Sequence, residues 1–558
     1  MPGIMVAFLL GIAFFLLLLV IAEKKRNKKR IEDLRKRWGK PRNEYFDFDK
    51  ITAYSNLQKD TPFHRLTPQT LADIDLHEVF TVIDHTTSRV GQQYLFNTLC
   101  TPSGNLKQLQ QTDAQVQFFT DNIQLRETVQ TELLSLHDSK AYNIAHLQEG
   151  KLQQRPSWYL LAVLDTIAVI VMLVLSIWFP VLLIWLMLPL AVNLFLHFRN
   201  KNNTYRFIWS FPQLNILLNV SAKLCRMELP FEIEPVVKSI AALKTFQKRS
   251  SLLNFGQTGI MDDVSQAMMY VFEMVKAFFL VEFHAFFVVT KELENKQQEV
   301  NDVFRFVGEI DTAIAIASLR AGALATCRPQ LIPAAKKFNI QKAIHPLIEN
   351  CTPNDMMVHD KSVLITGSNM SGKTTFLRTL GINAILAQSI YTCFAESYRA
   401  PLLKLYSSIR IDDNLLDGKS YYFEEVNIMS TLISAAGMAE QHLFLLDEVF
   451  KGTNTIERIA SAKAILSYLN RGNNLVFVAT HDIELAEMLA EAYELYHFAE
   501  DIRDNELLFD HTIKPGPLRT RNAIRILEIS NYPFSVTQEA KQISAQLQQQ
   551  RKGESDTK

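Results

Sequence analysis

The chain has 558 residues, 48% of them hydrophobic and 21% charged, and its 58 lysines and arginines balance its 58 acidic residues. This length is well above that of a usual single domain, so several parts are expected. The zero net charge excludes a protein that attracts nucleic acid through its overall charge. Five cysteines without a Cys-x-x-Cys pair indicate neither a disulfide framework nor a zinc site.

The N-terminal region combines an apolar run, Ile4 to Ala22, with a basic stretch, Lys24 to Lys40. At ~1.5 Å per residue, the apolar run is long enough to predict a transmembrane helix. The basic flank would place the following residues in the cytoplasm. A cleaved signal peptide is the alternative, which the position of that flank disfavours. The basic stretch itself favours contact with anionic lipid, with DNA contact as the weaker alternative.

Two further apolar segments, Trp158 to Trp178 and Val181 to Phe198, are separated by Phe179-Pro180. Basic residues flank both outer ends, so the pair predicts a transmembrane hairpin with both ends in the cytoplasm. A helical pair buried in protein is the alternative, which the length and all-round apolar character disfavour. Together with the N-terminal run, this predicts three transmembrane helices and a multi-pass protein of the cell membrane, the inner membrane in a bacterium.

A phosphate-binding loop pattern, G-x-x-x-x-G-K-[ST], occurs between a short apolar run, residues 361–366, and a helical segment, residues 374–387. In a strand–loop–helix unit, backbone N–H groups and the helix N-terminus can surround a polyphosphate. Lys373 is predicted to reach the outer phosphates of ATP, and the Thr374 hydroxyl to bind Mg²⁺. The predicted nucleotide-binding residues are Gly367, Ser368, Asn369, Met370, Ser371, Gly372, Lys373, Thr374 and Thr375.

Two later apolar strands end in the polar residues that phosphoryl transfer needs. Residues 441–448 end at Asp447, predicted to hold Mg²⁺ through water, and Glu448, predicted to polarise the attacking water. Residues 475–479 lead to His481, predicted to contact the γ-phosphate or that water. Glu448, His481 and Lys373 are therefore the predicted catalytic residues. A solvated acidic turn and a structural histidine are the alternatives.

The phosphate loop in its setting, ITGSNMSGKTTFLRTL, resembles that of the MutS family, ABC-type ATPases of DNA mismatch repair. Residues 410–426 are similar to the family's signature segment, with Ser420 on its serine and Glu425 on its following glutamate. Residues 75–102, with Asp84, Thr86 and Gly91, and residues 308–329, with Asp311, resemble the start and end of the family's helical core. Further landmarks are His345-Pro346-Leu347, Pro353-Asn354-Asp355, residues 447–458, residues 479–481, Tyr496-His497-Phe498 and Lys514-Pro515-Gly516.

The resemblance implies a C-terminal α/β P-loop ABC-type ATPase domain and an all-α core domain, to which the apolar runs add three transmembrane helices. It also implies a homodimer in which Ser420 of the partner subunit completes each ATP site. The expected parts are a transmembrane helix at 1–22, a basic segment at 23–60, the core at 61–150 and 200–335, the hairpin at 156–199, the ATPase domain at 336–540 and a polar tail at 541–558.

Departures from the family pattern affect the expected function. Cys351 stands where an aromatic residue often stacks on adenine, and Ser-Tyr-Tyr replaces Ser-Thr-Phe from Ser420. No mismatch-reading domain is expected before the core, and no DNA clamp within it. We therefore expect a membrane-anchored ATPase that acts on DNA in repair or recombination without direct mismatch reading. The alternatives are a mechanochemical ATPase with a membrane or protein partner and no DNA, and, less favoured, half of an ABC transporter.

Overall fold

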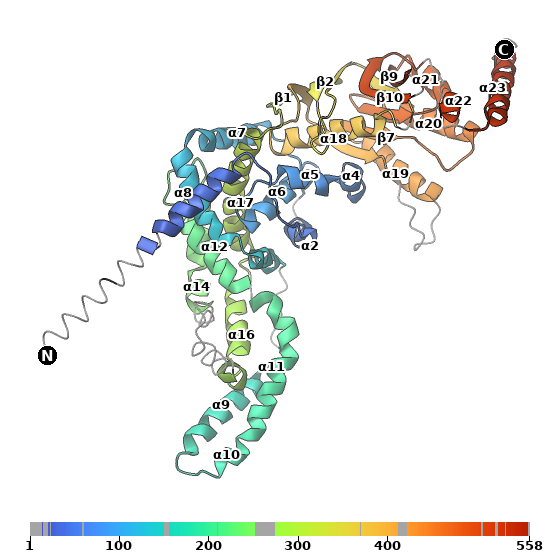
Figure 1. Cartoon of the computed structure of the whole chain (residues 1–558). Coiled ribbons are helices and arrows are strands. Elements are labelled where there is room, and N and C mark those ends of the chain that lie inside the picture. The colour runs from blue at the N-terminus through green and yellow to red at the C-terminus, as the bar shows by residue number, and fades with distance from the viewer. Residues whose placement is uncertain are drawn as a thin grey trace. The chain divides into compact units, whose positions relative to one another are not determined.

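The computed structural model describes residues 14, 21–22, 24–58, 61–149, 156–208, 210–250, 274–368, 370–410, 421–503, 506–518, 523–529 and 532–555 (Figure 1). The chain divides into two compact units. The first comprises Met1–Asp60, Phe80–Cys100 and Gln111–Ala323, and the second comprises Thr61–Val79, Thr101–Gln110 and Leu324–Lys558. The segment 61–150, expected as one part of the core, therefore contributes residues to both units.

The described part of the first unit is helical and is built around α17 (Gln297–Arg320). Apolar residues such as Val300, Val303, Phe304 and Val307 recur at helical spacing in α17 and are buried. Its main partner is α6 (Arg89–Cys100). The other described helices of this unit are a basic helix at residues 24–37, α2 (Phe48–Ile51), α3 (Ala53–Leu57), α8 (Ile123–Leu133), α9 (Tyr159–Leu175), α10 (Leu182–Trp185), α11 (Met187–Ile208), α12 (Ser210–Leu224), α13 (Glu234–Ala242), α14 (Lys244–Ser250) and α16 (Val281–Leu293), with 3₁₀ segments η1 (Leu134–Leu136) and η2 (Ser139–Gln148). Two more helices, α5 (Leu76–Ile83) and α7 (Leu106–Asp121), cross the boundaries between the units.

A buried carboxylate joins the segments that resemble the start and end of the MutS core. Asp311 of α17 accepts hydrogen bonds from the backbone N–H groups of Thr87 and Ser88, at 2.8 and 2.7 Å, and from the Ser88 hydroxyl at 2.6 Å. Burial raises the pKa of Asp311 to about 6, although these donors favour its charged form. Gly91 allows this approach, because a Cβ atom there would lie 2.1 Å from Asp311 Oδ2.

The predicted transmembrane hairpin is wrong: no helix in the described part of the chain is long and apolar enough to cross a membrane. The run from Trp158 forms α9, only 17 residues or ~26 Å long, short of the ~30 Å hydrocarbon core. The second run is divided at Leu186 into α10 and α11, and α11 continues into the polar, basic sequence after Phe198. The predicted Ile4–Ala22 helix lies outside the described residues, apart from Phe14, Ile21 and Ala22.

The expected fold class with three transmembrane helices, and the multi-pass location in the cell membrane inferred from it, are therefore corrected. In place of a membrane span, α9 packs along α16, with Trp158 stacked on Phe283 at a ring-centroid distance of 5.5 Å and Thr166 hydrogen-bonded to His284. The inner side of α9 is buried against protein, whereas other large apolar side chains of α9 to α11, such as Leu160 and Trp178, are exposed.

The described part of the second unit contains two β-sheets. The larger has the strand order β10-β9-β4-β8-β7-β6, with β4, β6, β7, β8 and β9 parallel and β10 antiparallel to β9. Its strands are β4 (Ser362–Thr366), β6 (Lys404–Ser408), β7 (His442–Asp447), β8 (Leu475–Thr480), β9 (Tyr493–Arg503) and β10 (Glu506–Pro515). The smaller sheet has the order β1-β5-β2-β3, from β1 (Gln330–Ile332), β2 (Lys337–Ala343), β3 (Asn354–His359) and β5 (Ser397–Pro401).

Helices surround the larger sheet because its central strands are apolar on both faces, and β4 and β8 are buried along their whole length. These helices include α18 (Lys373–Ser389), α19 (Tyr421–Ala436), α20 (Thr455–Leu469) and α21 (Ile483–Leu489), and the unit also contains α4 (Pro68–Asp73), α22 (Ala523–Ile529) and α23 (Phe534–Ser555). The register pairs Thr366 with Thr480 and Asp447 with Ala479. The carboxyl ends of β4, β8 and β7 therefore lie together at one edge of the sheet.

We expect Gly91→Ala to destabilise the protein by about 1–3 kcal/mol, because the added methyl group must displace the buried Asp311 carboxylate from its donors. Thermal unfolding followed by circular dichroism measures the effect. Gly437→Ala is the matched control, since a Cβ at that position would be no closer than 3.6 Å to its nearest neighbour, the Ser434 carbonyl oxygen. Equal unfolding temperatures for the two variants would contradict the importance of this close approach.

Candidate functional site

The phosphate-binding loop leaves β4 at Thr366 and enters α18 at Lys373. Gly367 and Gly372 have φ angles of 149° and 110°, which side chains other than glycine rarely adopt. A Cβ on Gly367 would also lie 2.8 Å from the Phe498 carbonyl oxygen. The Ser371 N–H and hydroxyl both donate to the Ser368 carbonyl, at 3.2 and 2.7 Å, and close the loop into a compact turn.

Lys373 lies inside this loop, with only 2% of its surface exposed. Its ammonium group donates to the carbonyl oxygens of Gly367 and Ser368, at 2.6 and 2.8 Å. Burial lowers the pKa of Lys373 to about 8, while the charges of Asp447 and Glu448 act in the opposite direction. The loop thus holds a cation at its centre through the main-chain oxygens of two of its residues.

Thr374 and Asp447 meet although 73 residues separate them in sequence. The Thr374 hydroxyl, in the first turn of α18, donates to Asp447 Oδ2 at the end of β7. Burial raises the pKa of Asp447, and the hydrogen bond from Thr374 and the charge of Lys373 partly oppose this shift. The two oxygen-bearing side chains predicted to serve Mg²⁺ are therefore brought together by the sheet register.

Glu448 has a left-handed backbone, with φ of 53°, immediately after β7. Its carboxylate contacts His481 Nε2 at 2.8 Å and Lys451 Nζ at 2.9 Å. Burial favours a raised pKa for Glu448, but the hydrogen bonds from His481 and Lys451 outweigh it and lower the pKa to about 2. Glu448 is therefore ionised at neutral pH, and His481 donates to it from the end of β8.

His481 Nε2 also lies 3.4 Å from Lys373 Nζ. A single ring nitrogen cannot donate to Glu448 and also accept from Lys373. The shorter contact, 2.8 Å to Glu448, assigns the proton to Nε2. All three residues predicted to be catalytic, Lys373, Glu448 and His481, thus form one contiguous cluster.

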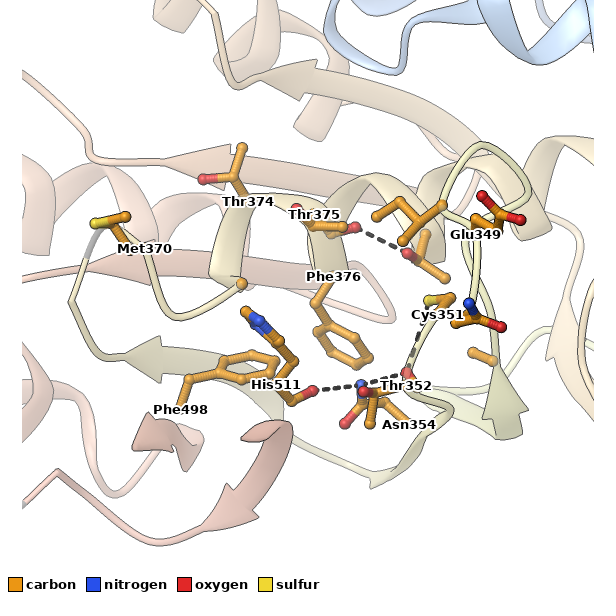
Figure 2. A pocket seen from close by; sticks show the side chains of 15 residues that line it. Glu349, Cys351, Thr352, Asn354, Met370, Thr374, Thr375, Phe376, Phe498 and His511 are labelled. Atoms are coloured by element: carbon orange, nitrogen blue, oxygen red, sulfur yellow. Dashed lines mark hydrogen bonds between the residues drawn. The ribbon is translucent and has the colours of Figure 1, made fainter. Parts of the chain in front are cut away.

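A pocket of about 410 Å³ adjoins the loop at the start of α18 (Figure 2). Phe376 and Phe498 form its apolar floor, with ring centroids 5.8 Å apart. His511 lies beside them and donates from Nδ1 to the Ser371 carbonyl oxygen at 3.2 Å. The size and mixed apolar and polar lining suit a small organic ligand whose charged end reaches the loop.

Sequence reasoning missed His511 and did not assign Phe498 to a ligand pocket. His511 sits at an irregularity in the β9–β10 pairing, with φ of 49°. Asn354 fixes this bulge, since its side chain donates to the His511 carbonyl at 2.9 Å and accepts from the Ile513 N–H at 2.8 Å. A bulge of this kind redirects a side chain. The Pro-Asn-Asp landmark was a signal for Asn354, but none pointed to His511.

The remaining predicted residues differ in position. Cys351 lines the pocket, and its thiol accepts from the His345 N–H at 3.3 Å. Met370 also lines the pocket and is 72% exposed. Glu425 is buried and accepts from the N–H groups of Lys451 and Gly452, which follow Glu448 by three and four residues. Asn369 and Ser420 lie outside the described residues.

The site joins a strand–glycine loop–helix unit, a buried lysine, a Thr–Asp pair at the adjacent strand end and a neighbouring ligand pocket. This combination defines the class of P-loop nucleotide-binding proteins. Residues 363–548 match the family model of MutS domain V.

Proteins with similar sequences are also MutS proteins. The chain is 30% identical over 272 residues to "DNA mismatch repair protein MutS" of Thermus thermophilus. The matched region is 48% of this chain and 33% of that protein. It is 32% identical over 272 residues to the protein of the same name from Petrotoga mobilis, covering 46% and 31%. It is 27% identical over 277 residues to "DNA mismatch repair protein MutS 2" of Halobacterium salinarum, covering 47% and 31%.

All of these similarities are to MutS proteins or to a MutS domain. The chain spans about a third of the length of these relatives, and the matched region is about half of the chain.

We expect the affinity for Mg-ATP to fall as pH rises through about 8, because only the protonated Lys373 attracts phosphate oxygens and its pKa is lowered to about 8. Well above this pH, the affinity for Mg-ATP should fall about tenfold for each pH unit, because binding is linked to one proton. Titration with a fluorescent ATP analogue between pH 7 and 9.5 measures it. Lys373→Ala should bind weakly and without this dependence; an equal pH dependence in that variant would contradict the assignment.

Proposed function

We propose that this protein is a MutS-type ATPase that binds and hydrolyses Mg-ATP and acts on DNA. The observation that carries the proposal is the convergence of Lys373, the Thr374–Asp447 pair and the Glu448–His481 pair at one edge of a parallel sheet. The pocket lined by Phe376, Phe498 and His511 adjoins this cluster and provides space for the base and ribose.

Lys373 binds the nucleotide by an exchange of partners. Its ammonium group gives up hydrogen bonds to the Gly367 and Ser368 carbonyls in favour of phosphate oxygens. Because the ammonium is already buried and surrounded by oxygen atoms, little further dehydration is needed when the phosphates arrive. The glycines keep the loop close enough to the phosphates for backbone N–H groups to donate to them.

The Thr374 hydroxyl and the Asp447 carboxylate fit Mg²⁺, since both are hard oxygen ligands and they already lie in contact. When bound, Mg²⁺ neutralises charge on the phosphate oxygens. Burial raises the pKa of Asp447, and a bound cation would act in the opposite direction, because a nearby positive charge favours the charged carboxylate.

Glu448 orients and polarises the attacking water. Its lowered pKa makes it a weak acceptor of a full proton, so its main contribution is to position the water by a charge-assisted hydrogen bond. His481 holds the carboxylate in place and lies between it and Lys373, where it can respond to the γ-phosphate. Lys451 competes for the same carboxylate.

Dimerisation and action on DNA rest on kinship with MutS proteins. By the family resemblance, Ser420 of the partner subunit would complete the ATP site of each protomer, so that ATP closes the dimer and hydrolysis opens it. The relatives quoted above are named DNA mismatch repair proteins, which favours DNA as the macromolecular partner. With DNA as the partner, the proposed role is in DNA repair or recombination.

Glu448→Gln should abolish at least 99% of ATP hydrolysis while Mg-ATP binding is retained, because the amide keeps the side-chain shape but loses the charge that polarises water. The trapped ATP state should also accumulate dimers, visible in sedimentation velocity with and without ATP. Glu487→Gln, an exposed residue of α21, is the matched control and should hydrolyse ATP normally. Wild-type turnover by Glu448→Gln would overturn the assignment of this residue.

DNA should change the steady-state rate of ATP hydrolysis by the full chain at least twofold. We would compare duplex, mismatched, branched and single-stranded DNA at two salt concentrations, because phosphate contacts weaken as salt rises. The form that gives the largest salt-sensitive change identifies the substrate. Robust hydrolysis that is indifferent to every form would instead favour a protein partner and contradict action on DNA.

A further inference from the structure

The strongest concentration of charge in the chain lies on the basic helix (residues 24–37) and the turn after it. Residues 24–40 contain ten lysines and arginines and only two acidic residues, in a chain whose net charge is zero. Six of these cations are exposed near the start of the helix: Lys24, Lys25, Arg26, Lys28, Lys29 and Arg30. In the part of the chain that the structure describes, no acidic side chain forms an ion pair with any of these six.

The charged residues occupy most of the helix circumference. At about 100° per residue, the cations cover about two thirds of the circle. The remaining strip carries Ile31, Leu34 and, just after the helix, Trp38. Leu34 is 9% exposed, and Arg126 of α8 stacks on the Trp38 ring at 3.5 Å. The apolar strip is therefore already used in packing against the first unit.

This packing fixes the helix to the first unit. Arg35 forms a two-point ion pair with Glu127 of α8, at 2.6 and 2.9 Å, and the Gly39 N–H donates to the Ser318 hydroxyl of α17 at 3.0 Å. A helix that lies in a lipid surface needs a free apolar face. This helix lacks one among its described residues, so charge is the property that it offers to a partner.

A hollow of about 260 Å³ continues the basic surface at the end of the helix. Lys36, Arg37, Lys40 and Arg42 line it. Its one acidic lining residue, Glu44, is already paired with Arg89 at 2.9 Å. The Arg42 side chain is only 7% exposed, lies 3.9 Å from the Asp84 carboxylate, and donates from Nη2 to the Thr87 carbonyl at 3.0 Å, so its charge is already used within the protein. Its exposed cations, Lys36, Arg37 and Lys40, thus extend the positive surface to the end of the helix and the turn after it.

We propose that residues 24–40 form a contact surface for the phosphate backbone of double-stranded nucleic acid, and that binding at this surface is independent of base sequence. Regularly spaced phosphates match exposed cations spread along a rigid helix, and such binding releases counterions. The proposal rests on the proposed action on DNA, and it places one contact on a segment before the helical core.

The test is binding of the full chain to a 30-base-pair duplex by fluorescence anisotropy across a salt series. A variant replaces the six exposed cations, four lysines and two arginines, with glutamine. If about half of them face the duplex at once, the slope of log affinity against log salt should fall by about three. Affinity at ~0.1 M salt should fall at least tenfold. A matched control replaces six exposed cations elsewhere, again four lysines and two arginines: Lys107, Lys291, Lys337, Arg399, Lys463 and Arg471.

The outcomes separate this inference from the proposed function. If the wild-type chain binds no duplex, action on DNA fails as well. If it binds but the variant keeps the same slope, or the control loses as much, only this surface is wrong. Unchanged basal ATP hydrolysis shows that both variants are folded. A parallel assay uses phosphatidylglycerol vesicles; loss of vesicle binding in the variant, with duplex binding intact, would assign the segment to anionic lipid and overturn the proposal.

Discussion

The burial of the Lys373 ammonium group is the constraint on which the phosphate-loop site depends. A cation with 2% exposure is tolerated only where oxygen atoms replace its water, and the Gly367 and Ser368 carbonyls do so. That requirement sets the path of the loop between β4 and α18, and with it the two left-handed glycines. In the proposed function the same ammonium would attract the polyphosphate, so that one charge would serve both the loop structure and ligand binding.

Two adjacent carboxylates at the end of β7 show how the surroundings assign different tasks to similar groups. Burial raises the pKa of Asp447, whereas hydrogen bonds from His481 and Lys451 overcome burial and lower the pKa of Glu448 to about 2. The left-handed backbone at Glu448 sends the second side chain away from the first. One carboxylate therefore faces Thr374 and the other faces His481, a separation that suits metal binding and water positioning respectively.

In the first unit, the local arrangement of charged and apolar side chains decides which helix surfaces are buried and which are exposed. The chain is neutral overall, yet the helix at residues 24–37 presents a dense positive surface because its narrow apolar strip packs on α8. The region of α9 is apolar instead of charged. Its long apolar run forms a 17-residue helix with one side against α16. Hydropathy summed along the sequence predicts a membrane span from such a run, but it does not show where the helix stops or what covers its faces.

Local sequence was sufficient for the phosphate loop and for the acidic end of β7. A glycine pattern between an apolar strand and a helix, and an apolar strand that ends in Asp-Glu, each constrain the backbone within a few residues. The pairing of Thr374 with Asp447, and of His481 with Glu448, needed the order of β4, β8 and β7 in the sheet. Likewise, Asp84, Gly91 and Asp311 were recognisable as a pattern, but their close packing is visible only in the fold. His511 and the ends of α9 depend on a bulge and on packing between distant segments. Contacts of that kind are set by the whole chain, so the sequence alone determined the chemistry of the loop, and the tertiary structure decided which side chains share its site.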